Sequence, residues 1–433
     1  MSMNVSTLRQ ICSEPYGFWL DSAMIDGQPD QASFCGRDPF LVLRSKGDFV
    51  EIAGRSRTHR CQANPFEVLR HLLREHGRRA SLPPGFTGTV GYLAYDLRRF
   101  VEDVPHRAVD DLGLPECYLC FYDDIVRFDP RLTAVDCQTA IGRSPPAEAI
   151  EVPVANFTAE AYRRAVERVR EYIFAGDVYQ VNLSQRFQLP LRESPFAAYL
   201  RLRSLNPASF AAYLNLPEVQ VLSASPEQFL HFDPRTRRVR TRPIKGTRPR
   251  GRTVREDDQL ARELLASEKD RAENVMIVDL ERNDLGRVAE VGSVQVAEIA
   301  ALETLPTVFH LTSTVEATLR EDHDLVDLLL ATFPGGSITG APKIRAMEII
   351  DELEPTARSV YTGAIGYIGM DGSLDLNIAI RTILAKDGKA YFQAGGGIVA
   401  DSDPELEYHE TLHKARALVE AVTGVYAMGL RQR

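Results

Sequence analysis

Short strand-like runs that follow one another with no helical pattern between them constrain the fold of this chain most. Near the C-terminus, three such runs cover Gly363 to Met370, Asp375 to Leu384 and Ala390 to Ala394. A regular alternation of strands and helices would instead indicate βαβ units and a parallel sheet. We therefore predict antiparallel strands with helices packed outside them, which is the α+β class.

The first third of the chain differs in pattern from the rest. It consists mainly of strand-like runs broken by Gly, Pro and Asp, with one helix candidate at Pro65 to Glu75. The strand-like runs are Tyr16 to Asp21, Pro39 to Leu43, Phe49 to Ala53, Gly88 to Tyr95 and Cys117 to Arg127. Because 433 residues exceed the usual size of one hydrophobic core, we expect two domains, at residues 1–150 and 156–425. The proline-rich segment Pro145 to Pro153 is the expected linker.

Three helices of the second part can be bounded from the sequence. Apolar residues recur with helical spacing after Thr158, which is a candidate N-cap. A second helix is expected over Asp257 to Leu280. The last helix begins at Pro404, a residue type favoured in the first turn, with Asp403 as its cap.

Composition excludes several classes of function. The formal net charge is -9, which argues against a nucleic-acid surface. The sequence has no apolar run long enough to span a membrane and no signal-peptide pattern, so we expect a cytoplasmic protein. Six cysteines in a chain of this length do not indicate a disulfide framework.

One amine stands out in the middle of the chain. Lys245 lies between Pro243, whose ring fixes φ, and Gly246, which tolerates backbone conformations that other residues avoid. This arrangement predicts a defined bend that presents the lysine. Arg242 and Arg248 would act as like charges and lower the pKa of the lysine, which favours a nucleophilic amine. A solvated basic loop is the alternative.

Two pairs of acids share the i, i+3 spacing that places side chains on one face of a helix. They are Asp270 with Glu273, and Glu407 with Glu410, and Lys414 falls on the same face as the second pair. Such a face is most often salt-bridged and exposed to solvent, and helix geometry alone favours that interpretation here. The alternative is a divalent-metal site, because Mg²⁺ is bound through one or two carboxylates together with water and substrate oxygens.

Four further features are candidates on chemical grounds, each with a structural alternative. Gly395 to Gly397 offers backbone amides to an anion or forms a structural turn, and the helix after it begins too late for a dinucleotide site. Arg381 either binds a substrate carboxylate or closes an ion pair. His310 hydrogen-bonds a substrate or a strand neighbour. Glu227 is a general acid in a dry site or an exposed turn residue.

Taken together, these segments resemble the chorismate-utilising enzymes. The matching stretches follow the order of that family over about residues 160–420, and they are Ser223 to Leu230, Arg242 to Pro249, Ala272 to Asp284, Pro334 to Lys343, Tyr361 to Tyr367 and Gly395 to Lys414. The resemblance implies the fold of that family, a large antiparallel β-sandwich with helices packed outside. The N-terminal third more weakly resembles the N-terminal domain of the anthranilate and aminodeoxychorismate synthase large subunits.

Two positions indicate which branch of the family the chain resembles. Anthranilate synthases carry alanine where this chain has Lys245, whereas aminodeoxychorismate synthases carry lysine. Gln180 occupies the position of a water-activating lysine in isochorismate and salicylate synthases, so ammonia is the expected nucleophile. The implied reaction converts chorismate and ammonia to 4-amino-4-deoxychorismate, on the route to 4-aminobenzoate and folate. Anthranilate formation and a non-catalytic subunit that only binds a glutaminase are the alternatives.

The resemblance also implies roles for the candidate residues. Lys245 would attack C2 of chorismate while Glu227 protonates the departing C4 hydroxyl. The expected Mg²⁺ ligands are Glu273 and Glu410, with Asp270 and Glu407 as supporting acids. The expected substrate-binding residues are Arg381, Lys414, Tyr367, Gly395, Gly396, Gly397, Thr339 and His310. No cysteine lies in the context of a glutaminase nucleophile, so ammonia is expected from a separate glutamine amidotransferase subunit.

A second pocket is implied by the same resemblance. Anthranilate synthases bind inhibitory tryptophan through a Leu-Leu-Glu-Ser segment, where this chain has Phe18-Trp-Leu-Asp-Ser22, and through an Asn-Pro pair that this chain keeps. The candidate tryptophan pocket therefore comprises Asp21, Ser22, Asn206 and Pro207.

Overall fold

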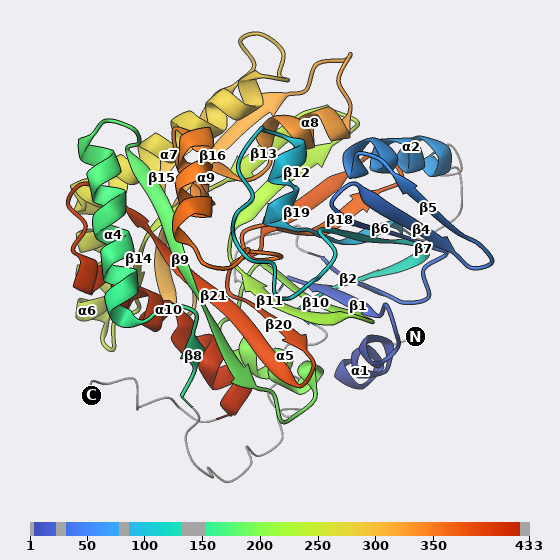
Figure 1. Ribbon diagram of the computed structural model, residues 1–433, viewed down its shortest axis with the longest axis horizontal. Helices are drawn as coiled ribbons and strands as arrows, with labels where there is room; N and C mark the ends of the chain where they lie inside the picture. Colours follow the sequence, from blue (N-terminus) through green and yellow to red (C-terminus); the bar gives the residue numbers. More distant parts are fainter. Residues whose placement is uncertain (1–3, 23–31, 78–85, 132–151, 425–433) are drawn as a thin grey trace.

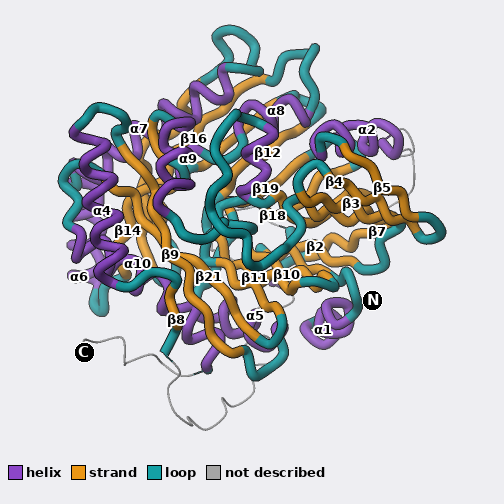
Figure 2. Tube along the Cα trace, viewed as in Figure 1, coloured by secondary structure: helices purple, strands orange, loops and turns teal. Residues whose placement is uncertain are grey.

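A computed structural model describes residues 4–22, 32–77, 86–131 and 152–424 of the chain (Figure 1). The strands form two large sheets that meet at a shared strand, β7 (Cys117–Phe128). Figure 2 shows the helices arranged around the outside of these strands. Pairing between the strands is antiparallel throughout both sheets, as in the hairpin of β20 and β21.

The first sheet combines strands from both ends of the chain. In spatial order its strands are β8 (Val154–Ala155), β9 (Gln180–Pro190), β21 (Lys389–Ile398), β20 (Thr382–Lys386), β11 (Val219–Ser225), β10 (Phe210–Leu216), β1 (Phe18–Asp21), β2 (Ser33–Gly36) and the end of β7. The short strand β17 (Gly340–Ala341) pairs with the start of β9.

The second sheet begins in the N-terminal third and ends beyond the middle of the chain. Its order is β5 (Thr58–Gln62), β4 (Phe49–Gly54), β3 (Leu41–Lys46), β7, β6 (Phe86–Leu93), β18 (Ala364–Gly369), β19 (Leu374–Ile378), β12 (Gln228–Asp233), β13 (Arg238–Arg242), β16 (Val308–Thr318) and β15 (Gln295–Thr304). β14 (Ile244–Pro249) continues the line of β13 along β16.

The helices cover the outer faces of the sheets. They are α1 (Val5–Ser13), α2 (Pro65–Gly77), α4 (Ala159–Phe174), α5 (Pro195–Leu205), α6 (Val254–Ala266), α7 (Glu268–Gly286), α8 (Leu325–Thr332), α9 (Lys343–Leu353) and α10 (Pro404–Thr423), with 3₁₀ turns η1 (Tyr95–Phe100) and η2 (Gly336–Ile338). The predicted caps are confirmed, because the Thr158 side chain accepts from the Ala161 amide and Asp403 accepts from the first turn of α10.

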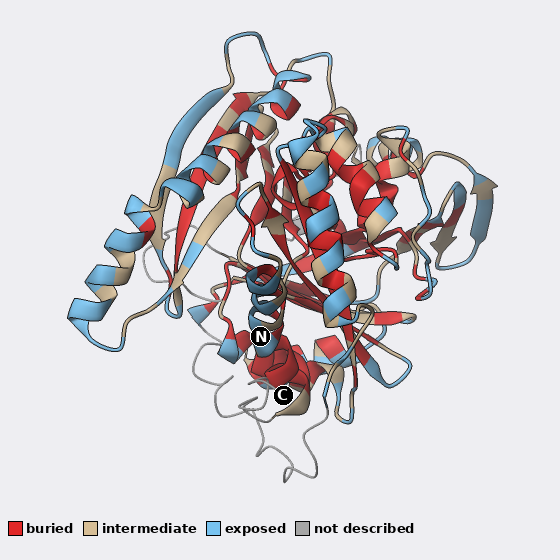
Figure 3. Ribbon diagram, turned by 60° about the vertical axis from the view of Figure 1, so that its left-hand side comes forward, coloured by how far each residue is buried: buried red, intermediate tan, exposed pale blue. Residues whose placement is uncertain are grey.

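Three large apolar clusters hold these layers together, and a small fourth cluster joins α6 to β16. One lies between the sheets, where Val90 and Tyr118 of the second sheet pack with Leu214 and Val221 of the first. Another joins α1, α5 and α10 to the outer face of the first sheet, and the third joins α2, α7 and α8 to the second sheet and α4 and α9 to β9 of the first. Figure 3 shows the buried surfaces concentrated on the strands and on the inner sides of the helices. The predicted α+β class and sandwich with outer helices are therefore confirmed.

The N-terminal third contributes strands to both sheets. β1 pairs with β10, and β6 pairs with β18, so strands from the two expected domains are hydrogen-bonded to one another. Residues 145–151 of the expected linker lie outside the described residues, and the division at residues 150–156 stays a prediction. No helix among the described residues is both long and apolar enough to cross a membrane.

Two predicted elements are each divided in two. The helix expected over Asp257 to Leu280 is interrupted at Ser267, whose backbone is extended and whose side chain accepts from the Asp270 amide to cap α7. The strand expected over Asp375 to Leu384 is split into β19 and β20, which belong to different sheets. Arg381 stands between them with φ of 49°, so the expectation that it lies within a strand was wrong.

Candidate active site

Lys245 is presented by a β-bulge. The pairing of β14 with β16 shifts register between Lys245 and Thr247, and Gly246 between them has φ of 80°. A Cβ at Gly246 would lie 3.0 Å from the Cβ of Asp270 and 3.0 Å from Leu264, so this position requires glycine for space as well as for conformation. The predicted bend is confirmed, and it packs against the start of α7.

The ammonium group of Lys245 points into a site of mixed charge. Its Nζ donates a hydrogen bond to the carbonyl of Ser337 at 3.0 Å. Burial lowers the pKa of Lys245, against the opposing effects of Glu273 and Glu227, while Lys414 lowers this pKa further. The lysine therefore has a larger neutral fraction than an exposed lysine at the same pH.

The predicted direction of this pKa shift is confirmed, but its predicted cause was wrong. Arg248 is engaged by Asp270 at 3.0 Å, and Arg242 lies 3.6 Å from Glu303. Alternate side chains of a strand point to opposite faces, so neighbours in sequence need not be neighbours in space. Burial, rather than the two arginines, shifts the pKa of Lys245.

Glu227 lies in the dry part of the same site. It precedes β12 and is 4% exposed, so the alternative of an exposed turn residue was wrong. Burial raises the pKa of Glu227, and the Ser337 side chain, the Lys245 charge and the Ile244 backbone only partly oppose this rise. A carboxyl group in such surroundings is suited to donate a proton near neutral pH.

Ser337 links the amine to the acid, and the sequence interpretation missed it. Its carbonyl accepts from Lys245, and its side chain bonds to Glu227. The neighbouring Thr339 had been selected instead, but its hydroxyl donates within the turn, to the carbonyls of Gly335 at 3.1 Å and Gly336 at 3.2 Å. Both residues belong to the Pro334 to Lys343 run, and spacing alone does not say which hydroxyl faces the site.

Glu273 and Glu410 bring two carboxylates together from α7 and α10. Burial raises the pKa of Glu273, Lys245 and Lys269 oppose this, and the charges of Asp270 and Glu410 add to the rise. Burial also acts to raise the pKa of Glu410, but Lys414, with its Nζ 2.6 Å away, together with Lys269 and Lys245 outweighs it, so this pKa is lowered.

The two supporting acids have partners of their own. Glu407 is 6% exposed and accepts a hydrogen bond from the Ser402 hydroxyl at 2.6 Å, and burial raises its pKa. Asp270 pairs with Arg248. No group of three or more His, Cys, Asp or Glu side chains forms a metal cluster within the described residues. Glu273 and Glu410 offer two carboxylates, the number that Mg²⁺ commonly takes from a protein.

The acidic face of α10 lies beside the glycines of β21. A Cβ at Gly396 would lie 3.0 Å from Oε2 of Glu407 and 3.4 Å from Oε1 of Glu410. The predicted salt-bridged and solvent-exposed face is confirmed for Glu410 and Lys414, whose paired side chains are 48% and 46% exposed, whereas Glu407 is buried. The glycine run is not a turn, because Gly395 and Gly397 continue β21 in register with β9. Because glycine has no side chain, the helix can approach the strand closely at these positions.

One edge of the glycine strand has no strand partner among the described residues. β20 pairs with β21 only as far as Phe392. The glycine run follows this point, so its backbone groups on that side of β21 have no partner in β20. Lys414 donates to the carbonyl of Gly395 at 2.9 Å. On the side of β9, the Gln180 amide fills the space where a Cβ of Gly397 would be.

Arg381 and His310 form a further polar pair. The guanidinium of Arg381 donates to Oδ1 of Asn206 at 2.7 Å, and it has no carboxylate partner within the described residues. Nδ1 of His310 lies 2.8 Å from the Thr247 hydroxyl, whereas its buried Nε2 has no partner there. Burial, followed by the charge of Arg381, lowers the pKa of His310 to about 3. The pair thus offers a cation and a neutral imidazole.

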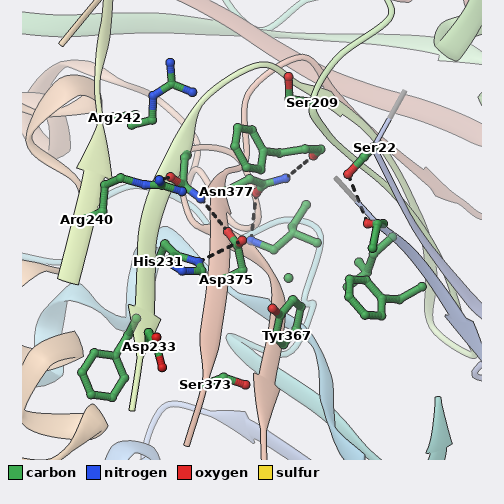
Figure 4. A pocket seen from close by; sticks show the side chains of 18 of the residues that line it. Ser22, Ser209, His231, Asp233, Arg240, Arg242, Tyr367, Ser373, Asp375 and Asn377 are labelled. Atoms are coloured by element: carbon green, nitrogen blue, oxygen red, sulfur yellow. Dashed lines mark hydrogen bonds and ion pairs between the residues drawn. The ribbon is translucent and has the colours of Figure 1, made fainter. Parts of the chain in front are cut away.

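Tyr367 lies apart from this site, in a second cavity of about 1550 Å³ that Lys245 does not line. Figure 4 shows Tyr367 in this cavity together with His231 and Asp375. Its ring packs on Phe34, with centroids 5.3 Å apart. The structure therefore does not group Tyr367 with the other residues expected to bind the substrate.

The candidate tryptophan pocket is only partly assembled around this second cavity. Asp21 and Ser22 line it, but the Asp21 carboxylate pairs with Arg203 of α5. Asn206 instead contacts Arg381, and Pro207 follows it in a partly exposed loop. Whether tryptophan binds here stays a prediction.

Comparisons with known proteins agree with the fold and the motifs. A sequence profile of the chorismate binding enzyme family matches residues 33–420. The aminodeoxychorismate synthase component 1 of Bacillus subtilis (strain 168) is 39% identical over 419 residues, covering 90% of this chain and 89% of that protein. The anthranilate synthase component 1 of Thermus thermophilus is 47% identical over 369 residues, covering 80% and 79%.

A solved structure extends this agreement to three dimensions. The anthranilate synthase component I from Streptococcus pneumoniae TIGR4 superposes with a TM-score of 0.77 at 31% sequence identity, over 92% of this chain and 94% of that chain. The chain belongs to the chorismate binding enzyme family. Relatives with two different products are similar to it at comparable identity, so the product must be argued from the site.

Proposed function

We propose that this chain is the chorismate-converting component of an aminodeoxychorismate synthase, and that it forms 4-amino-4-deoxychorismate from chorismate and ammonia. The observation that carries the proposal is the amine of Lys245, held at Ser337 within range of the Glu227 and Glu273 carboxyl groups. By the resemblance of the motif, an anthranilate synthase would carry alanine at that position. A lysine in this place is suited to form a covalent intermediate.

The first displacement uses both shifted groups. The lowered pKa of Lys245 favours its neutral amine, and the raised pKa of Glu227 favours its protonated acid. Glu227 donates its proton to the C4 hydroxyl oxygen, which leaves with the C–O electron pair as water. The nitrogen of Lys245 forms a bond to C2, and both ring double bonds shift by one position towards C4. The intermediate carries a positively charged secondary amine, and Glu227 is left as a carboxylate.

The second displacement restores the enzyme. Ammonia forms a bond to C4, both ring double bonds shift back, and the C2–N bond breaks with its electron pair returning to Lys245. The new ammonium at C4 gives one proton to the Glu227 carboxylate, so the balance is chorismate plus ammonia to product plus water. Splitting one substitution into two allylic steps lowers the barrier of each.

Substrate carboxylates are assigned to the cations of the site. Arg381 lacks a carboxylate partner in the described structure, and its planar guanidinium is suited to hold one in a bidentate manner. Lys414 and the unpaired edge of Gly395 to Gly397 are assigned to a second carboxylate. Mg²⁺ would be held by Glu273 and Glu410, and when bound it would neutralise the ring carboxylate. His310 is assigned to the ring, which its neutral Nε2 would contact.

The ammonia is assigned to a separate glutaminase subunit. The Bacillus subtilis relative is named component 1, which implies at least one further component of that enzyme. By analogy, we propose that this chain binds a glutamine amidotransferase in the cell and uses ammonium salts in its absence.

Anthranilate formation is the second candidate. It is favoured by the 47% identity to the Thermus thermophilus anthranilate synthase component 1. In that reaction, ammonia adds at C2 and pyruvate is released, so Lys245 would not form a covalent bond.

Product analysis distinguishes the two candidates. The purified chain is incubated with chorismate, MgCl₂ and ammonium, and its products are separated by chromatography and identified by mass. We expect 4-amino-4-deoxychorismate without pyruvate. Equimolar anthranilate and pyruvate would overturn the proposal, and so would the absence of any chorismate consumption.

A further inference from the structure

Glu281 is a buried acid next to the site that the proposed chemistry does not use. It lies on α7 and is 2% exposed. Its Oε1 accepts a hydrogen bond from the backbone amide of Gly336 at 3.0 Å, and its Oε2 has no partner within the described residues. A buried carboxyl group costs free energy unless it is compensated, so its presence behind the η2 turn calls for an explanation.

The turn that Glu281 holds is the one that contacts both reacting groups. Gly336 immediately precedes Ser337, whose carbonyl accepts from Lys245 and whose side chain bonds to Glu227. The contact with α7 is close, because a Cβ at Gly336 would lie 2.9 Å from Oε1 of Glu281 and 2.8 Å from Leu280. One hydrogen bond thus connects α7 to the carbonyl that orients the amine.

The preceding part of the loop is anchored by other side chains, Lys343 and Asp284, whose charges also act on Glu281. Nζ of Lys343 pairs with Asp284 and donates to the carbonyls of Thr332 at 3.0 Å and Pro334 at 2.8 Å. Removing the Glu281 carboxyl group therefore leaves Thr332 to Pro334 in place. The loss would be confined to the turn at Gly336 and Ser337.

We propose that Glu281 is a positioning residue that fixes the η2 turn, and thereby holds the Ser337 carbonyl and hydroxyl where they orient Lys245 and Glu227. This inference rests on the proposed function, because it assigns those two groups to the reaction. It predicts an effect on turnover and not on chorismate binding, since Glu281 contacts none of the residues assigned to the substrate carboxylates. Displacement of a reacting group by about 1 Å can cost about 100-fold in rate.

The test compares E281M, which removes the acceptor, with E281Q, which keeps a carbonyl oxygen for the Gly336 amide. E420M is the matched control, because Glu420 is also a buried acid with an unpartnered oxygen, and it lies ten residues beyond Glu410 on α10, about 15 Å along the helix. Chorismate consumption is followed at saturating ammonium and MgCl₂. We expect kcat to fall about 30-fold or more in E281M, with KM for chorismate changed less than about threefold. E281Q and E420M should stay within about threefold of wild type.

Two outcomes overturn the proposal: an E281M kcat within threefold of wild type, or an equal loss in E281M and E281Q. If E281M does not fold, G336A replaces it, because the added methyl group displaces the turn from Glu281, and the same kcat and KM pattern is required. The test measures chorismate consumption, which does not depend on which product forms. If the product is anthranilate, the proposed function is refuted, but the effect of E281M on turnover can still be measured. If no turnover is found, the rate at which cyanate modifies Lys245 is compared by peptide mass spectrometry, and an unchanged rate in E281M overturns the inference.

Discussion

The Nζ of Lys414 lies 2.6 Å from Oε1 of Glu410 and also donates to the Gly395 carbonyl. The two residues are assigned to different ligands, Glu410 to Mg²⁺ and Lys414 to a substrate carboxylate. Because the ammonium group already neutralises Glu410, a metal ion bound there must share this carboxylate with Lys414 or displace it. Under the proposed assignments, the ion pair would couple metal binding to substrate binding.

Replacing Lys414 should have opposite effects on the two ligands. In K414M, Glu410 loses its competing cation, so the Mg²⁺ concentration for half-maximal activity should fall severalfold. The KM for chorismate should rise about tenfold or more, because a charge-assisted contact is lost. K389M, at an exposed lysine of the same sheet, is the control. Mg²⁺ titrations at fixed chorismate measure both effects, and weaker Mg²⁺ binding in K414M would contradict the assignment.

Glu227 should act as an acid that must be protonated. E227Q keeps the shape of the buried side chain but cannot donate a proton, so kcat should fall about 100- to 10,000-fold. Burial raises the pKa of Glu227, and only its protonated form is active, so wild-type kcat should decline as pH rises through that pKa. A kcat of E227Q equal to that of wild type across the pH range would rule out this role.

Arg381 should contribute to binding through its geometry. R381K keeps the charge but loses the bidentate arrangement, so the KM for chorismate should rise about tenfold or more, with a smaller change in kcat. N206A removes the residue that orients the guanidinium and should produce a weaker effect in the same direction. Initial-rate kinetics measure both variants. An unchanged KM in R381K would show that the arginine has a structural role only.

Glu281 should make stability depend on pH. Burial raises its pKa in the folded chain to about 8, from an ordinary value of 4.5. Between these values the unfolded chain releases the proton and the folded chain keeps it, so the free energy of unfolding falls as pH rises from about 4.5 to about 8. E281Q lacks this contribution.

Urea unfolding at pH 5 and pH 8 measures the effect on wild type and E281Q. The stability of wild type relative to E281Q should be lower at pH 8, by about 1 kcal/mol or more. A difference that stays constant between the two pH values would contradict the buried, protonated state of Glu281.

The elements that the sequence predicted well are those with local signals. The caps at Thr158 and Asp403 follow from side chains that bond within one turn of their own helix. The division at Ser267 also has a local cap, but the flanking helical patterns join across it. The break at Arg381 occurs because the chain passes there from the second sheet to the first. The apolar periodicity is the same before and after this residue, so the sequence pattern does not indicate the break.

The site could be predicted as a set of residues but not as an arrangement. Spacing placed Glu407 and Glu410 on one face of α10, yet only the packing against Gly396 shows that Glu407 is buried there while Glu410 stays about half exposed. Likewise, the choice between Ser337 and Thr339 depends on which hydroxyl the turn uses for its own carbonyls. Burial also decides the pKa of Lys245, and burial is a property of the whole fold.

The central claim is that Lys245 forms a covalent bond with the substrate. Wild type and K245A are mixed with chorismate and MgCl₂ without ammonia, quenched, digested and examined by peptide mass spectrometry. The account predicts an adduct on the Lys245 peptide with the mass of chorismate less one water, which disappears when ammonium is added before the quench and is absent from K245A. A wild-type enzyme that turns over chorismate while its Lys245 peptide stays unmodified, and a K245A variant that makes the same product at a similar rate, would contradict it.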